Sequence, residues 1–564
     1  MLSFIKIRFY LIFFLLFYLN AIELNSQIIA KNGMVVSDSD IASQIGIDVL
    51  KKGGNAIDAV TATAFALAVT FPAAGNIGGG GFIIYLNSKN KVTSIDFREK
   101  APILASEKMF QNETGDLIYN SNHKGVKAIG VPGTVDGLYY AHKKYGTIPW
   151  NELVQPAINL ARNGFIMTIG LFNSVNNRKF HPTQDFLKNY FNNPQKKIVK
   201  PGEIWIQKAL SETLISIRDE GRNGFYDGWV ADEIVEFMKK NNGLITHKDL
   251  KNYNSVERDP IKGDYKGYKI YSMPPPSSGG VTLISMLNML EQIETEKINF
   301  DSTKYFHLLI EIMRIGFFER AKYLGDPDFN LNMPIEKLTS KVSSKTKFKL
   351  INQNKASKSL INGINHPNDG ENTTHISVVD KFGGAVSLTY TLESSFGSGM
   401  GSTKLGFIFN NEMGDFNPVA GLTTEAGLIG TSPNLIEPEK RMLSSMTPTI
   451  VTKNKKPYLI IGSPGGRTII NTVFQTIANV LLFNMGIKEA IEAPKIHHQW
   501  FPDNVRFEKN KLSDEIKNKL ILMGHNLIGV EQLGNLMGIL FDEKNKYFIG
   551  ASDSASSDGA AIGY

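Results

Sequence analysis

The sequence has no cysteine and only 4 tryptophans among its 564 residues. Without thiols the chain forms no disulfide, holds no metal through thiolates and has no cysteine nucleophile. Any covalent catalysis therefore depends on serine, threonine, lysine or a carboxylate. Beyond the N-terminal region, the sequence also lacks an apolar run of the roughly 20 residues that a membrane-spanning helix needs.

A strong charge of one sign is absent as well. The 61 basic and 54 acidic residues leave a formal net charge of +7 and a pI of about 9.0. No basic stripe interleaved with aromatics accompanies this mild excess, so nucleic acid is not an expected partner. With 42% hydrophobic and 20% charged residues, the composition is typical of a folded globular protein.

The N-terminal region has the order of a secretory signal. Lys6 and Arg8 precede an apolar run from Phe9 to about Leu19, and small and polar residues follow as far as Gln27. This run of about 11 residues is short for a membrane span. We therefore expect residues 1–26 to be a signal peptide and the mature protein to be secreted or periplasmic. An uncleaved membrane anchor is the alternative.

The expected elements alternate between strand and helix, which predicts a mixed α/β fold. Strands are expected at Ile28–Ser37, Phe82–Asn87, Val92–Phe97 and Gly406–Asn410, and helices at Ala56–Thr70, Val281–Glu291, Thr303–Leu324 and Thr468–Leu482. The glycines Gly78–Gly81 precede a strand, and no Gly-Lys-Ser/Thr follows them. Close backbone packing is therefore favoured over a phosphate-binding loop.

Two threonines, Thr373 and Thr374, begin an expected strand directly after a polar segment. Residues 330–370 are rich in Lys, Ser, Asn and Thr, a composition typical of a mobile surface segment where a chain is accessible to cleavage. A cut before Thr373 would give that residue a hydroxyl and a free α-amine on the same Cα. Nucleophile and general base would then be preassembled, so Thr373 is the candidate nucleophile.

The next two expected strands give a more specific prediction. Thr374–Asp380 and Ala385–Leu392 flank a glycine-bearing loop, which is typical of a hairpin. If Lys381–Gly383 forms the loop, Thr373 lies directly opposite Thr391. Opposed Cβ atoms are about 4.5–5.5 Å apart, within reach of a hydroxyl hydrogen bond. A loop one residue longer or shorter would break this pairing.

Three further features have both a functional and a plain structural interpretation. Gly465 and Gly466 precede a helix, so they present N–H groups to a developing oxyanion or simply form a helix-entry turn. Arg98 follows a strand, where an arginine clamps a substrate carboxylate or forms an ordinary ion pair. Ser444 and Ser445 are by themselves typical turn residues.

We expect no metal and no cofactor. His497 and His498 are adjacent on an expected strand and so point to opposite faces, and no helix-spaced partner accompanies them. No G-x-S-x-G nucleophile elbow occurs either. Together, the signals supply a nucleophile, an oxyanion site, a cationic clamp and acidic residues for an ammonium group. That set suits acyl transfer from a substrate with an α-amino acid head.

Over nearly the whole mature chain, the sequence resembles the γ-glutamyltranspeptidases. The motifs that carry this resemblance are Gly53–Ala56, Gly75–Phe82, Asp96–Glu99, Met273–Gly280, Leu324–Asp328, Thr373–Asp380, Leu443–Pro448, Gly462–Gly466 and Asp558–Tyr564. The resemblance implies an N-terminal nucleophile hydrolase with a four-layer αββα sandwich, made as a proenzyme that cleaves itself between Asn372 and Thr373. A large subunit, residues 27–372, and a small catalytic subunit, residues 373–564, would then form a heterodimer.

The resemblance also implies roles for residues of the site. Thr373 would be the nucleophile, its freed α-amine the base and Thr391 its hydrogen-bond partner, and Gly465 and Gly466 would form the oxyanion hole. The implied substrate-binding residues are Arg98, Ser444 and Ser445 for the α-carboxylate and Glu412 and Asp415 for the α-ammonium. Part of Asn417–Arg441 would form a lid.

Two positions depart from a common pattern of the family. Glu393 stands where many relatives have asparagine, and a third carboxylate should strengthen the demand for a cationic head. Ala426 fills the place of a lid tyrosine found in some relatives. Because lid closure governs access of water, the balance of hydrolysis and transpeptidation is left open.

The expected activity is that of a γ-glutamyl acyltransferase and hydrolase. Thr373 would attack the γ-amide carbonyl of a donor, for which the resemblance implies glutathione, and water or an amino acid or peptide amine would resolve the ester. One alternative is a β-lactam side-chain acylase of the same fold, which needs no ammonium pocket. The other is a non-catalytic binding protein for glutamyl peptides, against which Thr373, Thr391 and both glycines count.

Overall fold

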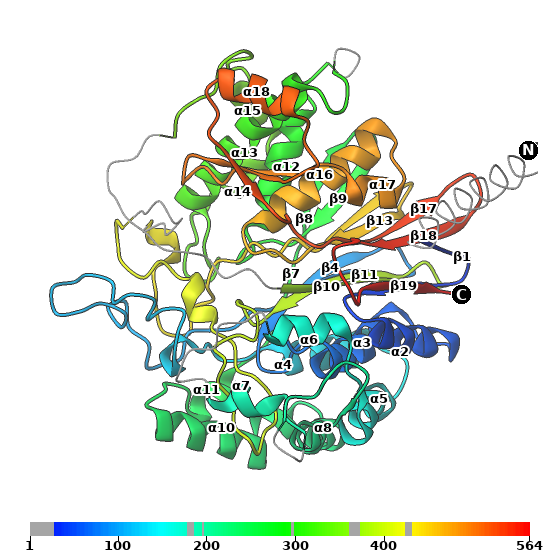
Figure 1. The fold of residues 1–564 in the computed structure, drawn as a ribbon, viewed down its shortest axis with the longest axis vertical. Coiled ribbons are helices and arrows are strands. Elements are labelled where there is room, and N and C mark those ends of the chain that lie inside the picture. Colours follow the sequence, from blue (N-terminus) through cyan, green and yellow to red (C-terminus); the bar gives the residue numbers. More distant parts are fainter. Residues whose placement is uncertain (1–26, 177–184, 194–196, 295–297, 360–372, 423–430) are drawn as a thin grey trace, which may run out of the picture.

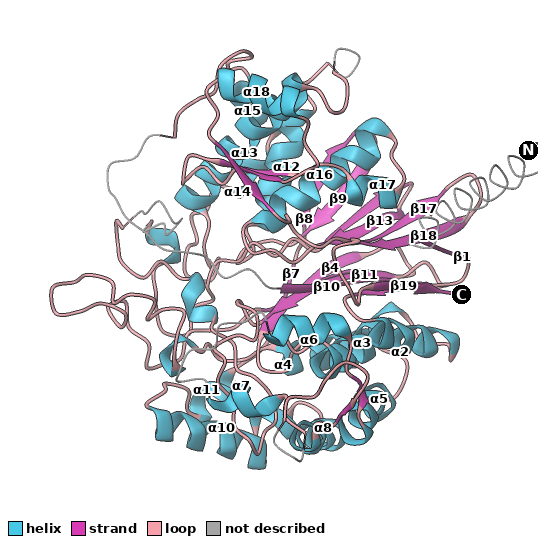
Figure 2. Ribbon diagram, in the orientation of Figure 1, coloured by secondary structure: helices cyan, strands magenta, loops and turns pink. Residues whose placement is uncertain are grey.

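Two stacked β-sheets with helices on both outer faces form the protein (Figure 1). The structure is a computed structural model that describes residues 27–176, 185–193, 197–294, 298–359, 373–422 and 431–564. Figure 2 shows the two sheets between an upper and a lower layer of helices. The expected four-layer αββα sandwich is confirmed. The expected signal peptide, Asn372 and Ala426 lie outside the described residues.

The first sheet combines strands from both ends of the chain. Its strands, in spatial order, are β1 (Gln27–Ala30), β18 (Tyr547–Ser552), β17 (Met537–Asp542), β13 (Lys456–Gly462), β12 (Thr449–Lys453), β9 (Tyr268–Ser272) and β8 (Ile261–Tyr265).

The second sheet has near its centre the hairpin that begins with Thr373, the candidate nucleophile. Its strands, in spatial order, are β19 (Ala560–Gly563), β2 (Met34–Ser37), β10 (Thr373–Val379), β11 (Ala385–Thr391), β3 (Gly80–Leu86), β4 (Val92–Phe97) and β7 (Val256–Arg258). Side chains alternate between its two faces, because successive residues of a strand point in opposite directions. In β3, Ile83 packs toward the helices, whereas Phe82 and Ile84 pack between the sheets.

One helical layer covers the second sheet. It contains α2 (Asp40–Lys51), α3 (Ala56–Thr70), α4 (Thr134–Tyr145), α5 (Trp150–Asn163) and α8 (Lys208–Glu220). Every residue of α3 is buried, since this helix lies between the sheet and α5. A capping box of Asn55 and Asp58 begins it, so the first backbone N–H groups are satisfied where the helix is buried. A helix that is buried on all sides, as α3 is, belongs in an inner layer.

The opposite layer covers the first sheet. It contains α12 (Gly279–Leu290), α13 (Thr303–Tyr323), α16 (Thr468–Phe483) and α17 (Ile487–Glu492). The other helices are α6 (Ile169–Asn176), α7 (Asp185–Tyr190), α9 (Asn223–Tyr226), α10 (Gly228–Asn241), α11 (His247–Asn252), α14 (Ile335–Thr339), α15 (Lys341–Phe348) and α18 (Asp514–Leu522). Short strands β14 (Ile496–His497), β15 (Val505–Glu508) and β16 (Leu527–Val530) form a third sheet, and β5 (Phe165–Ile166) pairs with β6 (Ile204–Trp205). No helix of the described residues is long and apolar enough to cross a membrane.

Two expected strands differ in the structure. Ile28–Ser37 is not a single strand, because the chain turns after Ala30 and passes from the first sheet into the second. Gly406–Asn410 forms no strand. Phe409 instead bonds with its N–H and carbonyl to loop residues Met400 and Ser398, and the Asn410 side chain donates to the carbonyls of Gly78 and Gly130. The apolar run thus indicated burial correctly, but its hydrogen bonds go to loops.

Candidate active site

Thr373 is the first residue of β10 and lies opposite Thr391, the last residue of β11. This is the pairing that a three-residue hairpin loop predicts, and it is confirmed. The two side-chain oxygens are 3.3 Å apart and both residues are buried, with Thr373 5% exposed. The hairpin register therefore places a second hydroxyl beside the candidate nucleophile.

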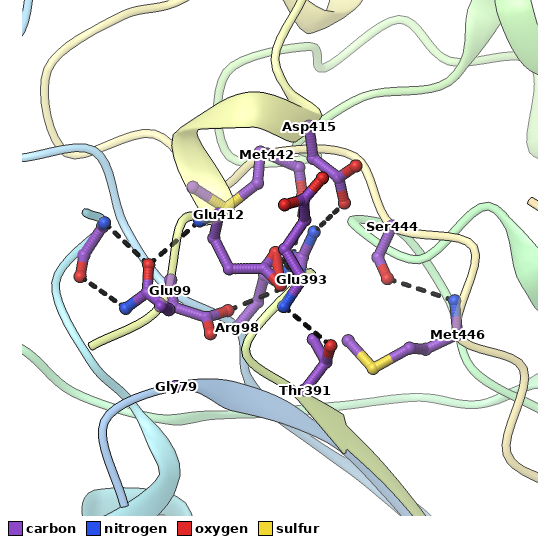
Figure 3. Close-up of polar contacts among 12 residues, drawn as sticks. Gly79, Arg98, Glu99, Thr391, Glu393, Glu412, Asp415, Met442, Ser444 and Met446 are labelled. Carbon is purple, nitrogen blue, oxygen red and sulfur yellow. Dashed lines mark hydrogen bonds and ion pairs between the residues drawn. The ribbon is translucent and has the colours of Figure 1, made fainter. Parts of the chain in front are cut away.

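The same Thr391 hydroxyl has a second contact. Its oxygen accepts a hydrogen bond of 2.8 Å from the backbone N–H of Glu393, as Figure 3 shows. Glu393 has a backbone φ of +77°, in the left-handed region that a residue with a side chain rarely adopts. Thr391 thus contacts the candidate nucleophile and also holds a strained turn that carries an acidic side chain.

The glycines around the start of β3 pack closely against β11, the strand that carries Thr391. A Cβ on Gly79 would collide with the Thr391 carbonyl, and a Cβ on Gly81 would collide with the backbone of the same strand. The close backbone packing that the sequence favours over a phosphate loop is confirmed. Asn76 adds to this contact, since its side-chain amide donates to the Thr391 carbonyl at 2.9 Å.

Nine of the ten predicted site residues line one cavity. They are Arg98, Thr373, Thr391, Glu393, Glu412, Asp415, Ser444, Ser445 and Gly466, together with Met446, Arg467 and Ile469. The tenth, Gly465, lines an adjoining cavity that also reaches Thr373. The structure therefore brings together residues that are more than 360 positions apart in the sequence.

Arg98 lies at the acidic end of this cavity and is fully buried. Its guanidinium is paired with Glu412, lies 2.5 Å from Asp415 and lies 3.4 Å from Glu99 (Figure 3). Burial opposes the charge of Arg98, but the three carboxylates outweigh that effect and raise its pKa. Glu99, which the sequence analysis did not single out, is thus part of the cluster.

The carboxylates around Arg98 are perturbed by burial. Desolvation raises the pKa of Glu99 to about 8, even though the Arg98 charge acts in the opposite direction. Desolvation likewise raises the pKa of Glu412 well above its ordinary value. Titratable groups that are perturbed in a cavity favour a functional site over an ordinary surface ion pair.

The two serines hold the opposite wall of the cavity. Ser444 accepts a hydrogen bond from the Met446 N–H at 3.1 Å, and Ser445 accepts one from Arg320 at 3.0 Å. Arg320 also donates to Ser278, whose hydroxyl donates to the Ser444 carbonyl. A second buried arginine, absent from the sequence prediction, therefore supports the serine pair.

Gly465 and Gly466 lie just before α16, as predicted. Their φ values are +128° and +53°, which favour glycine, and a Cβ on Gly465 would lie 2.5 Å from the Thr468 hydroxyl. The carbonyls of both glycines accept hydrogen bonds from the first turn of the helix. Their position at a helix N-terminus beside Thr373 suits the stabilisation of a developing negative charge.

Asp38 forms a polar network behind the nucleophile that the sequence analysis missed. It accepts hydrogen bonds from the Thr374 hydroxyl at 2.6 Å and from the Asn535 amide at 2.7 Å. Burial raises the pKa of Asp38 to about 7, although these bonds act against the shift. No local motif marks this residue, because its partners lie 336 and 497 positions away.

One histidine lies beside the candidate site, and two adjacent histidines lie away from it. His123 lies beside the cavity, with Nδ1 3.0 Å from a carboxylate oxygen of Glu393. His497 and His498 are buried elsewhere and bonded to neighbouring side chains, including Asn471 and Asp503.

Comparisons with known proteins agree with this geometry. The profile of the family described as "Gamma-glutamyltranspeptidase" matches residues 42–564. The glutathione hydrolase proenzyme of Escherichia coli K12 is 42% identical over 542 residues, which is 95% of this chain and 92% of the relative. The crystal structure of a cephalosporin acylase from Bacillus halodurans superposes with a TM-score of 0.83 at 26% identity, covering 96% of this chain and 97% of its own.

A second solved structure is nearer in sequence. The γ-glutamyltranspeptidase of Helicobacter pylori has a TM-score of 0.54 at 42% identity, covering 56% of this chain and 90% of the solved chain. The family profile matches across the Thr373 hairpin, the acidic cavity and the glycine turn. The chain belongs to the γ-glutamyltranspeptidase family.

Proposed function

We propose that the protein is a γ-glutamyl acyltransferase and glutathione hydrolase with Thr373 as its nucleophile. The observation that carries this proposal is the cavity in which Thr373 and Thr391 share one wall with Arg98 and its carboxylates. A hydroxyl pair next to a buried cation and several acids suits an acyl donor with a zwitterionic head. Relatives named glutathione hydrolase proenzymes support the same activity.

Activation is proposed to occur by cleavage between Asn372 and Thr373. The cut would free the α-amine of Thr373, whose reference pKa of about 7.7–8.0 leaves a useful neutral fraction near pH 7. This amine then takes the hydroxyl proton when the oxygen attacks the donor. The products are a large subunit, residues 27–372, and a small subunit, residues 373–564, held together without a covalent link.

Donor recognition is proposed to proceed by exchange of ion pairs. In the structure Arg98 is paired with Glu412 and Asp415 rather than available to solvent. A glutamyl head brings one carboxylate and one ammonium, so Arg98 pairs with the former while the acids pair with the latter. The exchange leaves the net charge of the buried cluster unchanged, because the head brings one charge of each sign. This limits the desolvation penalty. Ser444 and Ser445 add hydrogen bonds to the carboxylate.

The chemical step follows from these positions. The Thr373 oxygen attacks the γ-carbonyl carbon, and the negative charge that develops on the carbonyl oxygen is stabilised by the N–H groups of Gly465 and Gly466. The C–N bond breaks, and the leaving amine receives the proton from the Thr373 α-amine. Water or an amine acceptor then attacks the γ-glutamyl ester and releases the Thr373 hydroxyl.

A β-lactam side-chain acylase is the second candidate, because the Bacillus halodurans cephalosporin acylase shares the fold. A glutaryl side chain has no ammonium, so such a substrate would leave Glu393, Glu412 and Asp415 without a cationic ligand group. The acidic end of the cavity therefore favours the γ-glutamyl donor. Release of p-nitroaniline from its γ-glutamyl amide, compared with hydrolysis of a glutaryl cephalosporin, separates the two.

The protein is proposed to act outside the cytoplasm, after removal of residues 1–26. The basic residues and short apolar run at the N-terminus support this location. N-terminal sequencing of the large chain from a periplasmic extract or culture medium tests it. A large chain that still begins with Met1, found only in the membrane fraction, would refute it.

A denaturing gel of purified protein tests the mechanism. We expect two bands, with the smaller beginning at Thr373, and release of glutamate from glutathione. The Thr373→Ala variant should remain a single uncut chain, whereas Thr374→Ala, which alters the neighbouring hydroxyl, should still be cut. A single wild-type band, or a small chain beginning at another residue, would overturn the assignment of Thr373.

A further inference from the structure

Two histidines and a glutamate lie together on the side of the first sheet away from the nucleophile. His307 and Glu311 are one turn apart on α13, so their side chains share a face of that helix. His525 comes from the loop after α18, which packs against α13. In Figure 1 both helices lie at the top of the molecule, above the sheets. None of the three residues lines either cavity at Thr373.

The three side chains converge closely. One nitrogen of each histidine and one carboxylate oxygen of Glu311 all lie within 4.8 Å of one another. His307 is 0% exposed, Glu311 1% and His525 5%. Three ligand atoms of this kind at this separation could surround a single ion, because Zn²⁺ bonds to nitrogen and oxygen at about 2.0–2.2 Å.

Hydrogen bonds fix which nitrogen of His307 faces the cluster. Its Nε2 is 2.7 Å from the Asn352 carbonyl oxygen, and a carbonyl only accepts, so Nε2 carries the proton. Nδ1 then carries a lone pair and accepts a hydrogen bond from Nε2 of His525, 2.8 Å away. A histidine that donates one N–H to a backbone carbonyl and offers its other nitrogen inward is the usual arrangement around a protein-bound metal.

His525 has an unexplained polar atom. Its Nδ1 is buried and has no hydrogen-bond partner among the described residues. The hydrogen bond between the two histidines leaves this nitrogen unsatisfied, whereas a metal ion would accept its lone pair.

The surrounding charges leave room for a cation. Arg314 is paired with Asp503 and lies 3.4 Å from Glu311, so two carboxylates accompany one guanidinium. The neighbouring His498 lies 3.2 Å from Asp503 and does not add a positive charge, because burial lowers its pKa. Glu311, Asp503 and Arg314 together carry a formal charge of −1, so a divalent ion would meet a net negative environment.

We propose that His307, Glu311 and His525 form a binding site for a divalent transition-metal ion, with Zn²⁺ as the expected ion. Two imidazoles and one carboxylate suit Zn²⁺ and its neighbours, whereas Ca²⁺ and Mg²⁺ prefer oxygen ligands alone. The site is structural. Asn352 and Ser357, which bond to His307 and Glu311, belong to the stretch that follows α15, so the ion would tie that stretch to α13 and α18.

Metal content of the untagged, full-length protein tests the proposal. After loading with Zn²⁺ and dialysis, elemental analysis should find about one Zn²⁺ per wild-type chain, and His525→Gln and His307→Gln should each lose at least nine-tenths of it. His247→Gln removes an exposed histidine paired with Asp232 and should retain the ion. Equal metal content in wild type and both cluster variants would overturn the proposal.

A second measurement does not depend on the folding of the variants. Wild-type protein stripped with a chelator should melt at a lower temperature than the loaded protein, and added Zn²⁺ should restore the melting temperature whereas Mg²⁺ should not. A wild-type chain that binds less than about a tenth of an equivalent of Zn²⁺, or whose melting is unaffected by stripping and loading, would refute the site. Glutathione hydrolysis is not part of either readout, so this result is independent of the proposed activity.

Discussion

Replacement of Thr391 by valine is the sharpest test of how the hairpin builds the active site. Valine has nearly the same shape as threonine, so the change removes a hydroxyl without opening a cavity. That hydroxyl accepts the Glu393 N–H at 2.8 Å and lies 3.3 Å from the Thr373 oxygen. The valine variant loses both contacts: the one to Glu393 on the proposed substrate-binding side, and the one to the proposed nucleophile Thr373.

The size of the effect follows from these two contacts. A buried N–H left without an acceptor costs about 1–3 kcal/mol, and the longer bond to Thr373 contributes about 0.5–1.5 kcal/mol. At about 1.4 kcal/mol per factor of ten, loss of the Thr373 contact should lower kcat by about 2- to 10-fold. Displacement of Glu393 should raise KM, so kcat/KM falls by roughly 10- to 100-fold in all.

The assay is hydrolysis of a γ-glutamyl anilide by protein whose cut fraction has been measured on a gel, so that poor maturation is not mistaken for poor catalysis. Thr391→Ser keeps the hydroxyl and should retain most activity. Thr389→Val is a matched control, because Thr389 lies on the same face of β11 but bonds to His375. If cut Thr391→Val keeps more than half of the wild-type kcat/KM, or if Thr389→Val loses as much, the reasoning is wrong.

Three further predictions concern the residues around the nucleophile. Arg98→Gln should destabilise the fold by about 3–5 kcal/mol, because it leaves buried carboxylates unpaired. Arg98→Lys keeps a positive charge and should lose less stability. Equal melting temperatures for the two variants would contradict this prediction. Gly465→Ala should lower kcat by about 100-fold, whereas Gly383→Ala, equally strained at φ +86° but surrounded by open space, should leave kcat within about 2-fold of wild type. Burial raises the pKa of Asp38 to about 7, so the folded protein keeps a proton that the unfolded chain releases, and stability should fall as pH rises from about 4 to 7. Asp38→Asn should flatten that part of a plot of melting temperature against pH, and parallel curves for variant and wild type would refute it.

Local patterns in the sequence were sufficient to predict the nucleophile hairpin. The loop length sets the register of two adjacent strands, so Thr391 could be placed opposite Thr373 without any knowledge of the rest of the fold. The glycine turn before α16 was likewise a local feature. In both cases the residues that interact are close in sequence, and the geometry of one turn determines the contact.

The partners of Arg98 could not be predicted in this way. Asp415 is 317 residues away from Arg98, and nothing in either segment indicates that they meet. The resemblance assigned Arg98 and the acids to opposite ends of a substrate, but the structure pairs them with each other. Asp38 and Arg320 were missed for the same reason, since each reaches the site from an element whose own sequence is typical of ordinary packing.

The strand order of the two sheets has a consequence for refolding of the protein after it has unfolded. Both sheets contain strands from before and after Thr373, which pair with each other at several places: β1 with β18, β9 with β12, β3 with β11, and β2 with both β10 and β19. After a cut before Thr373, the two pieces could not separate without breaking both cores, so dilution should not split them. Refolding of the cut chains, however, would be a second-order reaction that slows as the protein is diluted. The uncut precursor folds as one molecule, so maturation would convert a folding reaction independent of concentration into one that depends on it.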